Sequence, residues 1–78
     1  MKYIETYENF HQELPSMTKF GSYESGDNRF VYHETAYLHN KTGELWLMVT
    51  KNGMGGGGVF YERYDENQEI KEILQRCK

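Results

Sequence analysis

The sequence predicts an α+β protein: a small antiparallel β-sheet of three or four strands in a meander, with an N-terminal and a C-terminal helix. Aromatic and β-branched residues form runs between residues 29 and 64, and turn sequences separate these runs. Both ends of the chain instead show the apolar spacing of amphipathic helices. The 78 residues suffice for a single domain, which we expect to span residues 1–78.

The first helix is expected over residues 3–14. Its apolar face would consist of four residues spaced four, three and four positions apart: Tyr3, Tyr7, Phe10 and Leu14. Pro15 ends this helix, because the residue before a proline is pushed out of the α region. A short edge strand is expected over residues 17–24, and Gly26-Asp27-Asn28 then predicts a turn.

Three more strands or strand-like runs and the second helix follow. Residues 29–39 favour a strand, and Asn40-Lys41-Thr42-Gly43 predicts a hairpin turn with Gly43 in the left-handed position. Residues 44–51 are apolar on both faces, so we place them at the centre of the sheet, and residues 59–64 favour another strand. The C-terminal helix is indicated by Ile70, Ile73, Leu74 and Cys77, with Asp65 and Gln68 as its capping box.

The alternation of side chains along the strands predicts two different sheet faces. One face, expected to lie under the helices, comprises Phe30, Tyr32, Ala36, Leu38, Leu45, Leu47 and Val49. The opposite face, expected to be uncovered and to bind a partner or ligand, carries Tyr37, Trp46, Met48, His33 and His39. The alternatives are a sheet covered on both sides and a homodimer that buries this face. Because a chain of this size buries only about 60–65% of its unfolded surface, we expect a homodimer or larger homo-oligomer.

The segment from Lys51 to Gly58 places five glycines in six residues. Gly53, Gly55 and Gly58 match the glycine spacing of dinucleotide-binding loops, but the residues that follow favour a strand where that motif requires a helix. A flexible or bulged hairpin connection therefore explains the segment best. The other interpretation is an anion-binding nest of backbone N–H groups. Its residues would be Gly53, Gly55, Gly56, Gly57 and Gly58, with Lys51 or Arg63 nearby.

The ionisable residues predict neither a metal site nor a catalytic site. His33 and His39 are six residues apart, roughly 20 Å along a strand, so the two cannot hold one ion. The chain has one cysteine, Cys77, and no pair of histidines at helical ligand spacing, so no metal and no cofactor are expected. Glu34 falls on the apolar side of its strand, where Arg63 is the expected partner. The other interpretations of Glu34 are an acid held protonated by burial and a misjudged strand register. No Ser/His/Asp arrangement is indicated, and we expect no enzyme.

The composition limits the class of partner. Twelve acidic against nine basic residues give a net charge of −3, which argues against a nucleic-acid backbone as the main partner. No stretch approaches the length of a membrane span, so no membrane association is expected. A single cysteine fits a reducing compartment, so we expect a cytoplasmic protein.

Three short sequences resemble a family of small uncharacterised bacterial and phage-borne domains. They are Gly43-Glu44-Leu45-Trp46-Leu47, Gly55-Gly56-Gly57-Gly58 and Tyr64-Asp65-Glu66-Asn67, and the resemblance covers residues 36–68. The family pattern runs from a strand through D-x-x-T-G-V-x-Y-L and a Gly-Gly stretch to L-x-D-x-x-G. Here Asn40 replaces the first Asp, Glu44 the valine and Gln68 the last glycine. The resemblance implies a small β-rich domain and no catalytic activity.

Together these observations predict a small non-catalytic binding protein of the accessory type encoded by bacteria or their phages. It would dock on or sequester a partner protein through Tyr37, Trp46, Met48 and the glycine segment. The alternative function is the binding of a small anionic ligand, such as a nucleotide, by the backbone amides of that segment.

Overall fold

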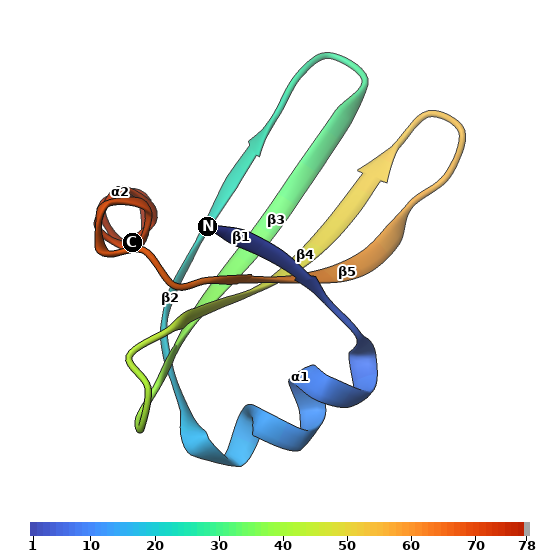
Figure 1. Cartoon of the computed structure of the whole chain (residues 1–78). Helices are drawn as coiled ribbons and strands as arrows, with labels where there is room; N and C mark the ends of the chain where they lie inside the picture. Colours follow the sequence, from blue (N-terminus) through green and yellow to red (C-terminus); the bar gives the residue numbers. More distant parts are fainter. Residues whose placement is uncertain (78) are drawn as a thin grey trace.

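One antiparallel sheet of five strands and two helices make up the computed structural model, which describes residues 1–77. In chain order the elements are β1 (Lys2–Glu5), α1 (Tyr7–Glu13), a 3-10 turn η1 (Leu14–Ser16), β2 (Met17–Gly26), β3 (Phe30–His39), β4 (Leu45–Gly53), β5 (Gly58–Tyr64) and α2 (Asn67–Arg76). The strands lie in the order β1-β5-β4-β3-β2 (Figure 1). The α+β class and the antiparallel sheet are confirmed, but the expected count of three or four strands is wrong, because the sheet has five.

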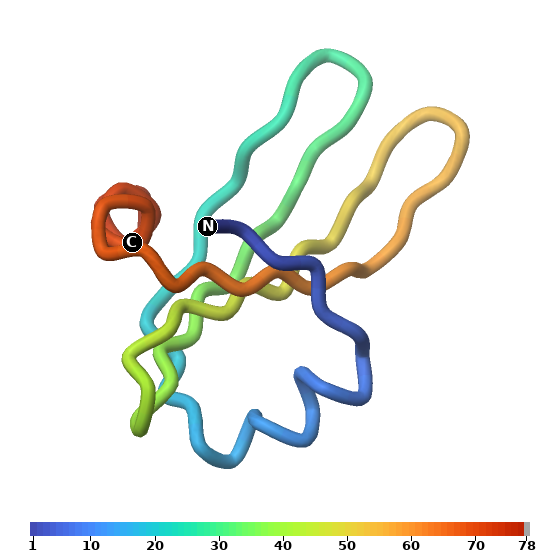
Figure 2. Tube along the Cα trace, in the orientation of Figure 1, coloured from blue at the N-terminus to red at the C-terminus, as the bar shows by residue number. Residues whose placement is uncertain are grey.

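The additional strand is β1, which lies where the sequence predicted the first turn of a helix. Tyr3 pairs with Arg63, and Glu5 pairs with Tyr61, so β1 forms the edge of the sheet next to β5. Figure 2 shows this N-terminal segment running beside the end of β5, although the two are far apart in sequence. Helix α1 begins only at Tyr7, after Thr6 Oγ1 accepts a hydrogen bond of 3.1 Å from the Asn9 N–H. Tyr3 is therefore not part of the helix, although its spacing from Tyr7 fits one, because its pairing with Arg63 of β5 holds it in a strand.

Strands β2 to β5 form the expected meander. Strand β2 is an edge strand and β4 is the central strand, as predicted. The turn between β3 and β4 contains Gly43 at a φ of 77°, which confirms its left-handed conformation. His39 is buried beneath this turn, and its Nδ1 accepts hydrogen bonds from the backbone N–H groups of Lys41 and Thr42 at 3.2 and 3.3 Å. The remaining ring nitrogen, Nε2, therefore carries the proton and lies 3.2 Å from Glu13 Oε2.

Helix α2 forms where the apolar spacing predicted it, but without the expected capping box. Glu66 occupies the N-cap position and makes no side-chain cap hydrogen bond. The Asp65 carboxylate instead accepts hydrogen bonds from the Met1 amino group at 2.9 Å and from Tyr3 Oη at 3.1 Å. These contacts join the end of β5 to the first residues of β1.

The two helices lie on opposite faces of the sheet. Ile70 and Ile73 of α2 pack on the face that contains Tyr23, Ala36, Leu45, Leu47 and Val49. Phe10 of α1 packs on the other face with Met17, Trp46 and Tyr61. The prediction that both helices cover one face is therefore wrong, and the alternative of a sheet covered on both sides applies to the part beneath α1.

Both helices are short, seven residues in α1 and ten in α2. Within residues 1–77, no helix has the length and apolar character needed to cross a membrane.

Candidate binding surface at the hairpin ends

The predicted aromatic binding face is covered by α1. Trp46 is only 5% exposed, while Tyr37 and Met48 are partly buried in the same cluster. Phe10 of α1 lies against this face, with its ring centroid 5.4 Å from that of Tyr37. The expectation that Tyr37, Trp46 and Met48 lie on an uncovered face is therefore wrong. The sequence did not reveal this, because α1 and α2 have similar apolar faces and either could have covered either side.

Arg63 lies on the α1 face of the sheet and does not line the space beside the glycine segment. Its guanidinium donates to Glu5 Oε2 at 2.7 Å and to Glu44 Oε2 at 2.5 Å. It also lies 4.1 Å from the centroid of the Tyr3 ring. The hydrogen bond to Glu5 raises the pKa of Arg63, and Glu44 adds to this effect. Arg63 therefore joins β5 to β1 through Glu5 and to the turn before β4 through Glu44.

Glu34 does not meet Arg63, because the two side chains lie on opposite faces of the sheet. Glu34 pairs with Val49 in the register of β3 and β4, whereas Arg63 pairs with Trp46. The Glu34 carboxylate is half-buried and accepts a hydrogen bond of 2.7 Å from Ser25 Oγ. The expected Glu34–Arg63 pair is therefore wrong.

The histidines do not form a common site. His39 is buried under its turn, while His33 is exposed toward the free end of the β2–β3 hairpin. Within the described residues 1–77, no group of three or more His, Cys, Asp or Glu side chains could hold a metal ion.

The glycine segment forms the turn between β4 and β5. Gly55 and Gly56 have φ angles of 93° and 120°, a conformation that favours glycine. Gly53 and Gly57 are needed for a different reason. A Cβ atom would lie 2.3 Å from the Arg29 carbonyl oxygen at Gly53 and 2.3 Å from the Lys51 carbonyl oxygen at Gly57. Four of the five glycines thus have a structural explanation, whereas Gly58 has an ordinary φ and open space around its Cβ position.

A shallow cavity of about 340 Å³ lies beside this turn on the α2 face. It is lined by Phe30, Lys51, Gly55, Gly56, Gly57, Gly58, Val59 and Phe60. The Lys51 ammonium lies 4.0 Å from the centroid of the Phe30 ring, which fixes this cation at the cavity wall. The structure therefore brings Lys51 together with the glycines, as the nest interpretation requires, but leaves Arg63 out.

The turn between β2 and β3 is held by hydrogen bonds to the side chain of Asp27. One Asp27 carboxylate oxygen accepts hydrogen bonds from the N–H groups of Arg29 and Phe30 at 2.8 and 3.1 Å. These two hydrogen bonds lower the pKa of Asp27. The Asp27 side chain therefore holds the backbone of this turn in one conformation.

The ends of both hairpins extend past the helices (Figure 1), and three exposed apolar residues belong to these two hairpins. Val31 is 49% exposed, Val59 is 54% exposed and Met54 is 84% exposed. Strand alternation places Val31, His33 and Val59 on the same side of the sheet as Trp46. We refer to Val31, His33, Met54 and Val59 as the hairpin-end surface.

Sequence reasoning missed this surface, although element length could have indicated it. A seven-residue helix is about 10 Å long, whereas a ten-residue strand extends for about 33 Å. Helix α1 can therefore cover only part of β3, and the uncovered residues had to lie near one end of the strand.

No known protein family, curated protein or solved structure matches this chain. The resemblance described for residues 36–68 therefore stays a prediction.

Proposed function

We propose that this chain is a non-catalytic binding protein that docks on a partner protein through the hairpin-end surface. The accessory role in bacteria or their phages, and the cytoplasmic location, belong to the same proposal. The observation that supports it is that Val31, Met54 and Val59 are exposed on the two hairpins, whose ends extend past the helices (Figure 1). Exposed apolar side chains that lie together are typical of protein interaction sites.

The charges around this surface support a partner with an acidic rim. Residues 24–33 and 50–59 carry two cations, Arg29 and Lys51, against two carboxylates, Glu24 and Asp27. The Asp27 carboxylate accepts hydrogen bonds from backbone N–H groups of its own turn. The chain as a whole has a net charge of −3, so the hairpin ends differ in charge from the rest of the molecule. Complementary charge would orient the partner, while the apolar contacts supply most of the affinity.

Photo-crosslinking in a bacterial lysate tests this proposal. A benzophenone amino acid replaces Val59 in one variant and Met54 in a second, and Ile4, which is 69% exposed on β1, provides the matched control. Both hairpin-end positions are expected to capture the same partner, and the control position is expected to capture none. Equal capture from Ile4, or no capture from either hairpin-end position, would contradict the proposal.

The Val31→Ser, Val59→Ser double variant supplies a second measurement. Both side chains are exposed, so the variant should keep its circular dichroism spectrum while losing the captured partner. Retention of the partner would place the interface elsewhere.

The cavity beside the glycine turn favours a second candidate function, the binding of a small anionic ligand such as a nucleotide. Its support is that Lys51 and Gly55–Gly58 line one space. Titration with inorganic phosphate and with nucleotides should then shift the amide resonances of Gly55–Gly58. Lys51→Met should weaken binding, and Lys71→Met on α2 should not. Unchanged resonances at millimolar ligand would remove this candidate for the ligands tested.

A further inference from the structure

The outer edge of β2 pairs with no other strand among the described residues. Strand β2 is ten residues long and pairs only with β3. Among residues 1–77, no backbone hydrogen bond other than those to β3 involves residues 18–26. The other sheet edge, β1, has only four residues. An unpaired edge of this length is a ready template for another strand.

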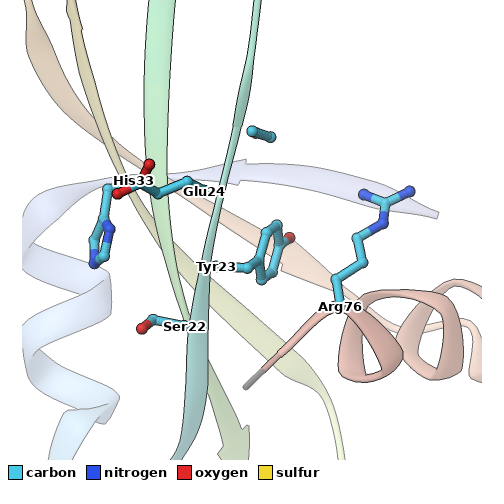
Figure 3. A pocket seen from close by; sticks show the side chains of 6 residues that line it. Ser22, Tyr23, Glu24, His33 and Arg76 are labelled. Carbon is cyan, nitrogen blue, oxygen red and sulfur yellow. The ribbon is translucent and has the colours of Figure 1, made fainter.

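A hollow of about 800 Å³ runs beside this edge, lined by Ser22, Tyr23, Glu24, Ser25, His33 and Arg76. Figure 3 shows Ser22, Glu24 and His33 on the side of β2 nearer α1, and Tyr23 and Arg76 on the side nearer α2. Neither helix lies in front of β2 in this view. Glu24 and Ser25, which line the hollow, are exposed, so the space next to them is accessible to an added strand.

A bulge in β2 determines which residues such a strand would face. The register shifts between Lys19, which pairs with Tyr37, and Gly21, which pairs with Ala36, so Phe20 is the extra residue. As a result, Lys19, Ser22 and Glu24 lie on the α1 side of the sheet, opposite Tyr37, Thr35 and His33. Thr18, Gly21, Tyr23 and Ser25 lie on the α2 side.

With this bulge, β2 is complementary to itself in antiparallel orientation. If Ser22 lies on a twofold axis, Lys19 of each copy is opposite Glu24 of the other. The same register places Gly21 opposite Tyr23 and Thr18 opposite Ser25. Every pair joins residues on the same side of the sheet, as an antiparallel ladder requires. Opposite charges meet twice, Thr and Ser can exchange hydrogen bonds, and Gly21 leaves room for the tyrosine ring.

We propose that two copies of this chain pair through β2, antiparallel and centred on Ser22, to form one continuous sheet with Lys19 of each copy opposite Glu24 of the other. A β-strand from a different protein could use the same backbone groups. Two observations favour a second copy of this chain. The Lys19–Glu24 pair forms twice, and every pair in this register joins residues on the same side of the sheet. Val31, Met54 and Val59 of the hairpin-end surface lie outside β2 and remain accessible in this arrangement. His33, which also lines the hollow, lies next to the proposed interface.

Charge reversal tests the pairing directly. Both Lys19 and Glu24 are exposed, so their replacement should leave the fold intact. Lys19→Glu and Glu24→Lys should each raise the dimer dissociation constant about tenfold or more, because two attractive pairs become repulsive. The double variant K19E/E24K should restore it. Sedimentation equilibrium gives these constants, and Lys71→Glu on α2 is the control with the same change in charge.

Disulfide trapping tests the register. In a Cys77→Ser background, Ser22→Cys should form a covalent dimer under mild oxidation, because opposite Cα atoms of a ladder are 4.5–5.5 Å apart. Thr18→Cys alone should not, but it should cross-link when mixed with Ser25→Cys. A chain that is monomeric at all concentrations, a double charge variant that fails to recover, or equal self-cross-linking of Thr18→Cys would each overturn the proposal.

Discussion

Phe10 stacks on Tyr61, with ring centroids 4.7 Å apart and ring planes inclined by 27°. The contact fixes α1 against the sheet and closes one face over Trp46. Phe10 is 1% exposed, so Phe10→Ala should lower the free energy of unfolding by about 3–5 kcal/mol. Urea unfolding measures this loss. Tyr7→Ala is the control, because Tyr7 is exposed on the same helix, and it should cost less than about 1 kcal/mol.

The buried ring of Trp46 should contribute more to the free energy of unfolding than its N–H group does. Its buried Nε1 has no hydrogen-bond partner among the described residues. Trp46→Phe keeps most of the ring and removes this unpaired donor, so we expect a loss of about 1–2 kcal/mol, against about 3–5 kcal/mol for Trp46→Ala. Thermal melts of both variants separate the two effects. Equal stability of the Ala variant and the natural chain would restore the uncovered-face interpretation.

Arg63 should contribute to stability by neutralising two carboxylates at once. Arg63→Met leaves Glu5 and Glu44 partly buried without their cation, and we expect a loss of about 1–3 kcal/mol. Adding Glu5→Gln and Glu44→Gln to the Met variant should recover part of this loss in urea unfolding. If the triple variant is no more stable than Arg63→Met, the destabilisation arises from lost packing on Tyr3 and Trp46.

Tyr23 should make the fold sensitive to alkaline pH. Burial, followed by the nearby Glu34 carboxylate, raises the pKa of Tyr23 to about 12. In the unfolded chain the pKa is about 10, so the neutral phenol stabilises the fold below that pH. This contribution is lost as the pH rises from about 10 toward 12. Tyr23→Phe should lose less stability than the natural chain over this range. Tyr7→Phe, at an exposed ring, should follow the natural chain.

The glycines of the β4–β5 turn should differ in their tolerance of a methyl group. Gly58→Ala should change the free energy of unfolding by less than about 0.5 kcal/mol, because its surroundings are open and its φ is ordinary. Gly56→Ala is strained by its φ of 120°, and Gly57→Ala brings Cβ within 2.3 Å of the Lys51 carbonyl oxygen. We expect each of these two to cost about 1 kcal/mol or more. If the Gly56→Ala, Gly57→Ala and Gly58→Ala variants have equal melting temperatures, the backbone of this turn does not hold the conformation described above.

Local patterns in the sequence predicted the strands of the meander and α2, because each depends on its own residues and a nearby turn. Gly43 and Ile70 are examples, since their conformation or burial follows from neighbours in the chain. Tyr3 and Asp65 were misplaced, because their partners lie about 60 residues away. The hairpin-end surface was missed for a related reason. Whether Val31 is covered depends on where α1 ends over the sheet, and no local pattern around Val31 records that.

The order of the strands also determines when each one can fold during synthesis on the ribosome. Strands β2 to β5 are neighbours both in sequence and in the sheet, so each hairpin can close soon after its second strand emerges. Strand β1 is the first of the five strands to be made but pairs with residues 61–64, so it must wait until β5 has been made. Until then Phe10 lacks Tyr61, and α1 cannot complete its contacts with the sheet. Of the five strands, β1 is therefore the first to leave the ribosome and the last to take its place in the sheet, and the β4–β5 hairpin controls when this occurs.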